Sequence, residues 1–505
     1  MKPVFRTGLL CLVLISWFPK DLRSCTTLIA GKNTTSDGSI IFAKSEDDQE
    51  GKLDYYWHIP SKHHDIPSTI METGGLQIPQ VDTTYAYFWD QTPKMMFSNV
   101  LINEWGVAFG SDGCHSKEDP VEILEKRGDI VDGGLGFRLR FILAERSRTA
   151  REAVLLAVEL LDRYGYNGSG RCLNIVDPGE AWQLQMVRGM HYVARRVRDD
   201  EVAIIANTFS IREVDAEDTV NFICSPDLIE YAIRRGWYNP ETDGAFDFAR
   251  AYAAEEAHTG NGNTHRTWIL ASLVQKDFPL SITEAEAGKM PVSVIPGRKL
   301  NLQEIMGMFR DHYENTELCR YCDTRISPHY VRHSPVCNDR THKVNIIQQR
   351  NWLPREIGTV NWRALGHPCQ SVFIPWYLGI NEIPEAYQMA TEDPNETDKN
   401  LPTYHFMVPE RELRNMDMHS ASCVFRLLGE LCDADYASYI ARIRDTFGEM
   451  ESELLNNQQI FEERALGLYD ADRDLAISTL TDYSCNQAMR GFRLAKRIIT
   501  ELVNK

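Results

Sequence analysis

The sequence lacks several features that mark whole classes of protein. Its 505 residues carry 54 basic against 72 acidic side chains, so there is no excess of positive charge with which to bind nucleic acid or an anionic membrane. The apolar run from Gly8 to Phe18 has 11 residues, whereas a membrane-spanning helix needs about 20. No glycine-rich nucleotide-binding motif stands between a predicted strand and helix, and no His-Glu-x-x-His motif of a catalytic zinc site is present.

What is present fits a folded protein that acts on a small partner. Hydrophobic residues make up 43% of the chain and charged residues 25%, the proportions of an ordinary globular protein. The length allows about three domains of roughly 150 residues, or one elaborated domain with a helical extension. We therefore expect a small-molecule or peptide partner and no nucleic acid.

The N-terminus predicts export. Lys2 and Arg6 precede the apolar run, and the polar stretch after it ends in a small residue, Ser24. This is the pattern of a signal peptide or short propeptide over residues 1–24, with cleavage before Cys25 by one cut or two. The protein is then exported or secreted, to a periplasm, the extracellular space or the lumen of a secretory pathway. Ten further cysteines would remain beyond Cys25, an even number compatible with disulfides.

Short apolar runs and turn signals predict strands in two groups with a pair of helices between them. Thr149 followed by Glu152 is a capping-box pattern at the start of the second helix. Strands, a helix pair and more strands are typical of a layered α+β domain rather than of alternating β-α-β units. The predicted strands cover residues 26–31, 39–44, 85–89, 97–102, 107–109, 172–176, 182–187, 192–197 and 202–206, and the helices cover 137–144 and 149–164.

Beyond residue 225 the pattern is mostly helical. Ser225 before a proline predicts the start of a helix. Residues 317–400 are predicted to be loop-rich, and the chain is expected to close with two or three amphipathic helices. We thus divide the chain into residues 1–24, a core of 25–225, its helical and loop-rich continuation over 226–433, and C-terminal helices over 434–505.

Cys25 is the residue that most clearly indicates chemistry. Cleavage before it would give one residue both a thiol nucleophile and a free α-amine, whose pKa values of about 8.5 and 8 are close enough for the amine to accept the thiol proton. The thiolate would attack a carbonyl and form a thioester, which water would hydrolyse. The non-catalytic alternative is a lipoprotein acylated at Cys25.

The motif order resembles one family. The chain is similar to the dipeptidase A-like family of N-terminal-nucleophile cysteine peptidases, to which secernins are related, and the similarity covers most of the mature chain. This resemblance implies a four-layered αββα core and hydrolysis of dipeptides. The matching segments are residues 25–33 (CTTLIAGKN), 37–39, 46–47, 103–107 (NEWGV), 145–153, 177–182, 207–209, 246–250 (FDFAR) and 362–375.

The resemblance also implies roles for individual residues. Asp47 falls where wider relatives place an acid that contacts the α-amine or thiol, and Lys44 replaces the arginine that steadies the thiolate. The alternative for Asp47 is a solvated turn carboxylate. Asn207 matches the position of an oxyanion donor, and Asn103 is a second candidate, although asparagine also favours strand ends and turns.

Two arginines could bind a substrate carboxylate. Arg250 and Arg266 are each able to make the bidentate contact that a carboxylate requires, but a structural salt bridge is the preferred interpretation for both.

A second cluster of sulfur and imidazole groups suggests a metal. Paired cysteines with a later Cys or His suit tetrahedral zinc, but a second Cys-x-x-Cys is missing and export favours disulfides. We therefore expect disulfide or free thiols here, and no metal or other cofactor. The residues concerned are Cys319, Cys322, Cys337, His312, His329, His333 and His342.

Together these observations predict an exported cysteine dipeptidase. Its catalytic residues would be Cys25, Asp47, Asn207 and Asn103, its substrates dipeptides or short peptides, and its contact with membranes limited to export. The first alternative is an amidase of the same fold that acts on acylated small molecules, and the second is the lipoprotein. The sequence leaves a homo-oligomer open.

Overall fold

The computed structural model describes residues 25–47, 53–72, 74–91, 100–255, 261–321, 325–330, 334–388 and 417–504. The predicted leader over residues 1–24 lies outside this part of the chain, as do Cys322 and His333.

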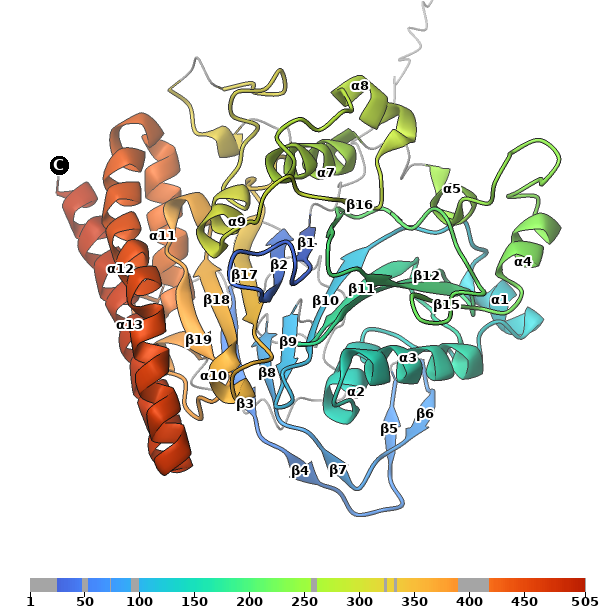
Figure 1. Ribbon diagram of the computed structural model, residues 1–505, viewed down its shortest axis with the longest axis horizontal. Helices are drawn as coiled ribbons and strands as arrows, with labels where there is room; N and C mark the ends of the chain where they lie inside the picture. The colour runs from blue at the N-terminus through green and yellow to red at the C-terminus, as the bar shows by residue number, and fades with distance from the viewer. Residues whose placement is uncertain are drawn as a thin grey trace, which may run out of the picture.

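Two large antiparallel sheets form the centre of the molecule (Figure 1). The first sheet has the order β16 (Ser293–Val294), β14 (Val202–Ile205), β1 (Thr26–Ala30), β2 (Ile40–Asp47), β17 (Thr341–Gln349), β18 (Thr359–Leu365) and β19 (Ile374–Tyr377). The second has the order β15 (Phe222–Cys224), β13 (Tyr192–Val197), β12 (Ala181–Met186), β11 (Arg171–Val176), β10 (Ala108–Gly113), β9 (Val100–Asn103), β8 (Tyr87–Gln91) and β3 (Tyr55–Ile59). Two small ribbons pair β4 (Lys62–His63) with β7 (Thr83–Thr84) and β5 (Thr69–Met71) with β6 (Gln77–Pro79).

The described helices all follow β10 in the chain and lie between and after the later strands. They are α1 (Val121–Arg127), α2 (Leu139–Arg146), α3 (Ala150–Tyr164), α4 (Leu228–Arg234), α5 (Phe248–Tyr252), α7 (Asn261–Val274), α8 (Ile282–Glu284), α9 (Leu302–Met308), α10 (Arg355–Gly358), α11 (Ala421–Ala434), α12 (Tyr436–Ala471) and α13 (Arg473–Val503). A π-helical turn covers Ala285–Lys289, and 3₁₀ turns cover Pro328–Tyr330 (η2), Pro368–Gln370 (η3) and Glu385–Tyr387 (η4). Among the described helices, none combines the length and the apolar character that crossing a bilayer requires.

The alternation of side chains along each strand decides what the sheets bury. In β2, Ile40 and Phe42 join a core shared with Ile102 and Val176 of the second sheet, while Ile41 and Ala43 point the opposite way. The outer side of the first sheet is covered by α7, α9, α11, α12 and α13, and that of the second by α2 and α3 (Figure 1). Apolar residues therefore fill the space between the sheets as well as the space under the helices.

The mixed helix and sheet content agrees with the prediction. The strands predicted before residue 207 are present as β1, β2 and β8 to β14, although residues 97–99 of the strand predicted over 97–102 lie outside the described part of the chain, and β3 to β7 were not predicted. The helix pair is also confirmed: the Thr149 hydroxyl caps α3 by accepting the Glu152 amide at 3.1 Å. The start predicted for α4 is shifted, because Asp227 precedes the helix and the Ser225 hydroxyl instead donates to the Tyr192 carbonyl at 3.1 Å.

The prediction of a loop-rich segment over residues 317–400 was wrong for its centre. Three strands, β17, β18 and β19, lie there and extend the first sheet from β2, with β19 at its edge. They escaped detection because β17 lacks an apolar alternation: its buried Lys343 and Asn345 are satisfied by Asp54 at 2.6 Å and Asp90 at 2.8 Å. Such partners, distant in sequence, make polar residues compatible with an interior strand.

Candidate active site

Cys25 lies at the start of β1, where the first sheet meets the second. Thr27 pairs with Ile205 of β14, and Thr26 pairs with Ser45 of β2. Continuing these registers places Cys25 beside Asn207 on one side and beside Glu46 on the other. The thiol is 6% exposed and donates to Glu46 Oε1 at 3.4 Å, which agrees with that register.

A buried ion pair lies on the same face of β2. Lys44 Nζ is 2.6 Å from Asp112 Oδ1, and neither side chain is exposed to solvent. Asp112 Oδ2 accepts from Thr27 Oγ1 at 2.8 Å and from Asn174 Nδ2 at 2.9 Å. The pair thus bridges the two sheets next to the nucleophile and has several hydrogen bonds to compensate for the loss of water.

The electrostatic environment keeps the Cys25 thiol protonated in the chain as described. Burial, followed by the Glu46 carboxylate, raises its pKa well above the ordinary value, and the Lys44 ammonium only partly opposes them. A thiol is a poor nucleophile until it becomes a thiolate. A local base is therefore needed to activate this residue.

Asp47 is part of a buried strand and not a solvated turn. Its carboxylate accepts from Thr341 Oγ1 at 2.6 Å and from Asn338 Nδ2 at 2.8 Å. Burial raises the pKa of Asp47 to about 6, although the Arg266 guanidinium and these two hydrogen bonds oppose the shift. Its backbone carbonyl lies 3.8 Å from the Cys25 sulfur.

Asn207 follows β14 in a left-handed conformation, with φ of 56°. Arg266 Nη2 donates to Asn207 Oδ1 at 3.1 Å and to Asn263 Oδ1 at 3.0 Å, and Asn207 Nδ2 donates to the Gly113 carbonyl at 3.4 Å. The arginine thereby fixes the orientation of the Asn207 side-chain amide, with Oδ1 toward the guanidinium and Nδ2 toward the Gly113 carbonyl. Arg266 is fully buried, and its Nε and Nη1 have no hydrogen-bond partner among the described residues.

Asn103 stands at the end of β9 and has a structural partner for each polar atom. Its Nδ2 donates to the carbonyls of Ala144 at 2.9 Å and Ser147 at 2.7 Å, and its Oδ1 accepts from the amides of Trp105 and Val107. The side chain holds the 103–107 turn against α2. No described contact joins Asn103 to Cys25.

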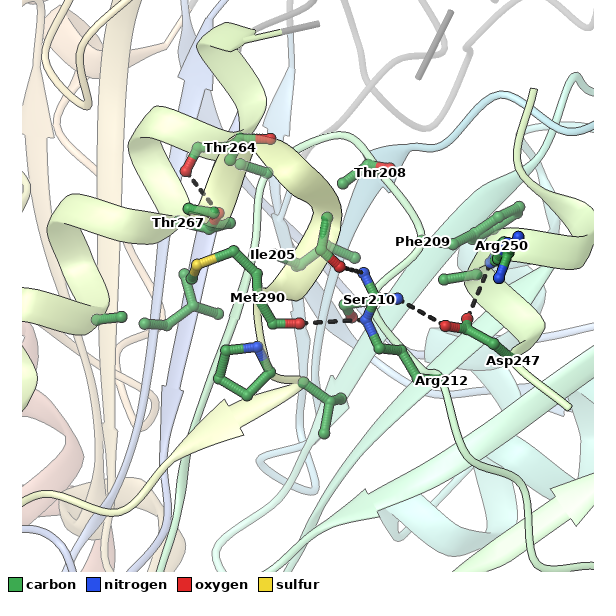
Figure 2. A pocket seen from close by; sticks show the side chains of 18 of the residues that line it. Ile205, Thr208, Phe209, Ser210, Arg212, Asp247, Arg250, Thr264, Thr267 and Met290 are labelled. Carbon is green, nitrogen blue, oxygen red and sulfur yellow. Dashed lines mark hydrogen bonds and ion pairs between the residues drawn. The ribbon is translucent and has the colours of Figure 1, made fainter. Parts of the chain in front are cut away.

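A cavity of about 800 Å³ opens beside the strand end that carries Asn207. Ala206 and Thr208, the two neighbours of Asn207, line it, and so does Arg250. Figure 2 shows Arg212 reaching across it to Asp247, at 2.6 Å, and to the Met290 carbonyl, at 3.1 Å. The volume suits a small ligand, and the lining carries charges of both signs.

The cysteines and histidines considered as a possible metal site in the sequence do not form a single cluster. Cys319 is disulfide-bonded, while the other nine cysteines in the described part of the chain are free. His342 Nδ1 lies 2.5 Å from Asp54 Oδ2, in the interior of the first sheet. His312, His329 and Cys337 come together, and they are joined by Cys369.

Sequence analysis missed the parts of this site that depend on contacts between the sheets. Asp112 was not considered, although it follows Ala108 and Gly110 at the strand period, where a charged residue signals a buried partner. Glu46 belongs to the 46–47 segment of the family resemblance and received no role from the sequence, yet it is the carboxylate that contacts the thiol. Nothing in the local sequence of Arg266 distinguishes it from a surface arginine.

Comparisons with known proteins give one consistent family. The family model described as peptidase family C69 matches residues 24–407. A probable dipeptidase from Salmonella dublin is 25% identical over 393 residues, which cover 76% of this chain and 86% of the relative. Dipeptidase A from Lactobacillus helveticus is 23% identical over 440 residues, covering 86% of this chain and 89% of that protein.

Solved structures resemble parts of the chain only distantly. A conjugated bile acid hydrolase from Clostridium perfringens has a TM-score of 0.21 and 12% identity, over 42% of this chain and 56% of that one. An N-acylethanolamine-hydrolyzing acid amidase orthologue from Caenorhabditis elegans has a TM-score of 0.19 and 11% identity, over 42% of this chain and 77% of that one.

Proposed function

The chain belongs to peptidase family C69, and from that premise we propose that it is an exported cysteine dipeptidase whose nucleophile is Cys25. The observation that carries this proposal is the position of the thiol, which lies beside Glu46 and, by strand register, beside Asn207. The dipeptidases among its relatives support the reaction and the substrate class. We also assign the two facing sheets with their outer helices to a four-layered αββα fold.

Activation begins with cleavage of the bond before Cys25. The family match starts at residue 24, which supports a cut at this point after export. The register of β1 with β2 brings Cys25 opposite Glu46, next to Asp47, and the Cys25 sulfur lies 3.8 Å from the Asp47 carbonyl, so the new α-amine lies within reach of Asp47. Asp47 accepts a hydrogen bond from the amine and orients its lone pair toward the thiol.

The reaction then follows from the groups around Cys25. The α-amine takes the thiol proton, and the thiolate attacks the carbonyl carbon of the dipeptide. The oxyanion receives a hydrogen bond from Asn207 Nδ2, whose direction Arg266 fixes. The C–N bond breaks, the second amino acid leaves with the proton, and water hydrolyses the thioester to release the first amino acid and restore the thiol.

Arg266 is the best candidate for binding the substrate carboxylate. It keeps Nε and Nη1 without a hydrogen-bond partner among the described residues, in a buried position next to Asn207, and a substrate carboxylate could accept from either of them. Arg250 lines the neighbouring cavity instead. Asn103 has no place in this mechanism, because its amide is committed to the 103–107 turn.

The lipoprotein alternative fits the geometry poorly. A lipid chain on the Cys25 sulfur would have to leave the protein interior, yet the thiol is buried against Glu46. If the native protein partitioned into detergent and had a blocked N-terminus, the lipoprotein alternative would be favoured over the peptidase.

The test uses native protein whose N-terminus has been sequenced. Cys25→Ser should keep the fold and lower kcat for dipeptides by at least about a thousandfold, whereas the control Cys224→Ser should not change it. Penicillin V and conjugated bile salts, assayed in parallel, separate the dipeptidase from the amidase alternative. Undiminished dipeptide hydrolysis by Cys25→Ser would refute the assignment of the nucleophile.

A further inference from the structure

Four buried side chains from separate segments meet in one place. His312 lies after α9, His329 in η2, Cys337 before β17 and Cys369 in η3. Their ligand atoms all lie within 4.8 Å of one another, and each residue is at most 3% exposed. We call this group the Cys2His2 cluster. Sequence analysis considered three of its members, but not Cys369, and expected disulfide or free thiols there.

The histidine tautomers direct two lone pairs into the cluster. His329 Nδ1 lies 3.0 Å from both carboxylate oxygens of Asp433, and His312 Nδ1 lies 2.9 Å from Glu314 Oε1. A carboxylate only accepts, so each Nδ1 carries a proton, and a ring without a second proton offers its Nε2 lone pair. Those two Nε2 atoms are 3.3 Å apart. Two facing lone pairs repel unless a proton or a metal ion lies between them.

The positions of the two sulfur atoms also indicate a metal ion at the centre of the cluster. His329 Nε2 lies 3.5 Å from Cys337 Sγ and 3.5 Å from Cys369 Sγ, in addition to its contact with His312. One ring nitrogen makes a single hydrogen bond, so hydrogen bonding cannot satisfy three close neighbours at once. A central metal ion would use one lone pair from each of the four residues.

The distances match tetrahedral zinc. With Zn–N bonds of about 2.0–2.1 Å and Zn–S bonds of about 2.3 Å, tetrahedral geometry separates two nitrogens by about 3.3–3.4 Å and a nitrogen from a sulfur by about 3.5–3.6 Å. The cluster shows 3.3 Å and 3.5 Å for these separations. We propose that His312, His329, Cys337 and Cys369 bind one structural zinc ion.

The surroundings support a structural role rather than a catalytic one. Four protein ligands complete a tetrahedral zinc site and leave no position for water or substrate. Asp433 and Glu314 supply the outer carboxylates that orient metal-bound histidines. Asp433 itself is held by Ser327 Oγ at 2.8 Å and by the Gln370 amide, so it is a supporting residue and not a fifth ligand.

Such a zinc ion would tie the C-terminal helices to the candidate active site. Asp433 belongs to α11, and Cys337 immediately precedes Asn338, whose amide donates to Asp47 at 2.8 Å. Among the described residues between α9 and β17, the short turn η2 is the one regular element. Metal ligation therefore gives this segment the fixed position that Asp47 requires.

The experiment measures metal in the intact protein and does not depend on activity. Wild-type protein purified from zinc-supplemented cells should contain about one zinc per chain by mass spectrometry of the metal content. Replacement by Co²⁺ should give the strong visible bands of a tetrahedral site and a thiolate-to-cobalt charge-transfer band in the near ultraviolet. Cys369→Ser and Cys337→Ser should lose the ion, while the control Cys485→Ser should keep it.

Several results would overturn the proposal. One is wild-type protein that holds no zinc and takes up no Co²⁺. Another is a disulfide between Cys337 and Cys369 in a non-reducing peptide map of the native protein. A third is equal metal loss from Cys485→Ser. Because the first two measurements use the wild type, the proposal stays testable even if the cluster variants do not fold.

Discussion

Replacing Asp112 tests whether the buried ion pair beside Cys25 holds the two sheets together. Asp112→Asn keeps the shape of the side chain but leaves the Lys44 ammonium without a counter-charge at a site with no solvent exposure. In the wild type Asp112 accepts hydrogen bonds from Lys44, Thr27 and Asn174. The asparagine would direct an NH2 group toward at least one of these donors. We therefore expect both the charge and one or more hydrogen bonds to be lost.

The size of the effect follows from two estimates. Removing one partner of a buried pair destabilises a protein by about 3–5 kcal/mol. Lys44 can escape an unpaired charge by losing its proton, which at pH 7 costs about 4.6 kcal/mol from an ordinary pKa near 10.4 at 1.36 kcal/mol per pH unit. The two figures agree, so Asp112→Asn should lower the free energy of unfolding by about 3–5 kcal/mol.

The assay is urea unfolding followed by circular dichroism at pH 7. The matched control is Asp200→Asn, because Asp200 pairs with Arg198 at 3.0 Å while both side chains are about half exposed, and it should cost less than about 1 kcal/mol. Combining Asp112→Asn with Lys44→Met removes both charges and should restore much of the stability. A single variant within about 1 kcal/mol of wild type would refute the reasoning.

Two further predictions concern the chemistry. Because burial raises the pKa of Asp47 to about 6, kcat/KM should rise with pH through that value, as the carboxylate forms and accepts from the amine. The folded state binds this proton more tightly than the unfolded state. The free energy of unfolding should therefore decrease as the pH rises from about 4 to about 6. Asp47→Asn should abolish both dependences, and a profile that it leaves unchanged would exclude the role. Arg266→Lys should raise KM for dipeptides about 10- to 100-fold, whereas for C-terminally amidated analogues it should leave KM nearly unchanged and lower only kcat, through the lost contact with Asn207. Arg250→Lys is the control, and a larger effect from it would move the carboxylate site into the cavity.

The sequence determined most of the first half of the fold. The strands β1, β2 and β8 to β14 and the pair α2 and α3 follow from local apolar periodicity and from the Thr149 cap, which act over a few residues, whereas β3 to β7 were not predicted. The family also followed from short motifs in order, and the family model confirms it. Cys25 could be proposed as the nucleophile from sequence because its position after a leader-like segment is itself a sequence feature.

The tertiary structure decided everything that depends on pairing between distant segments. It placed the polar strand β17 inside a sheet because Asp54 and Asp90 neutralise or bond its side chains. It paired Lys44 with Asp112 across two sheets and buried Arg266 against Asn207. It also gathered the Cys2His2 cluster from four segments. A charge or a ligand becomes functional through the partner it meets, and that partner lies tens to hundreds of residues away, where no local pattern can indicate it.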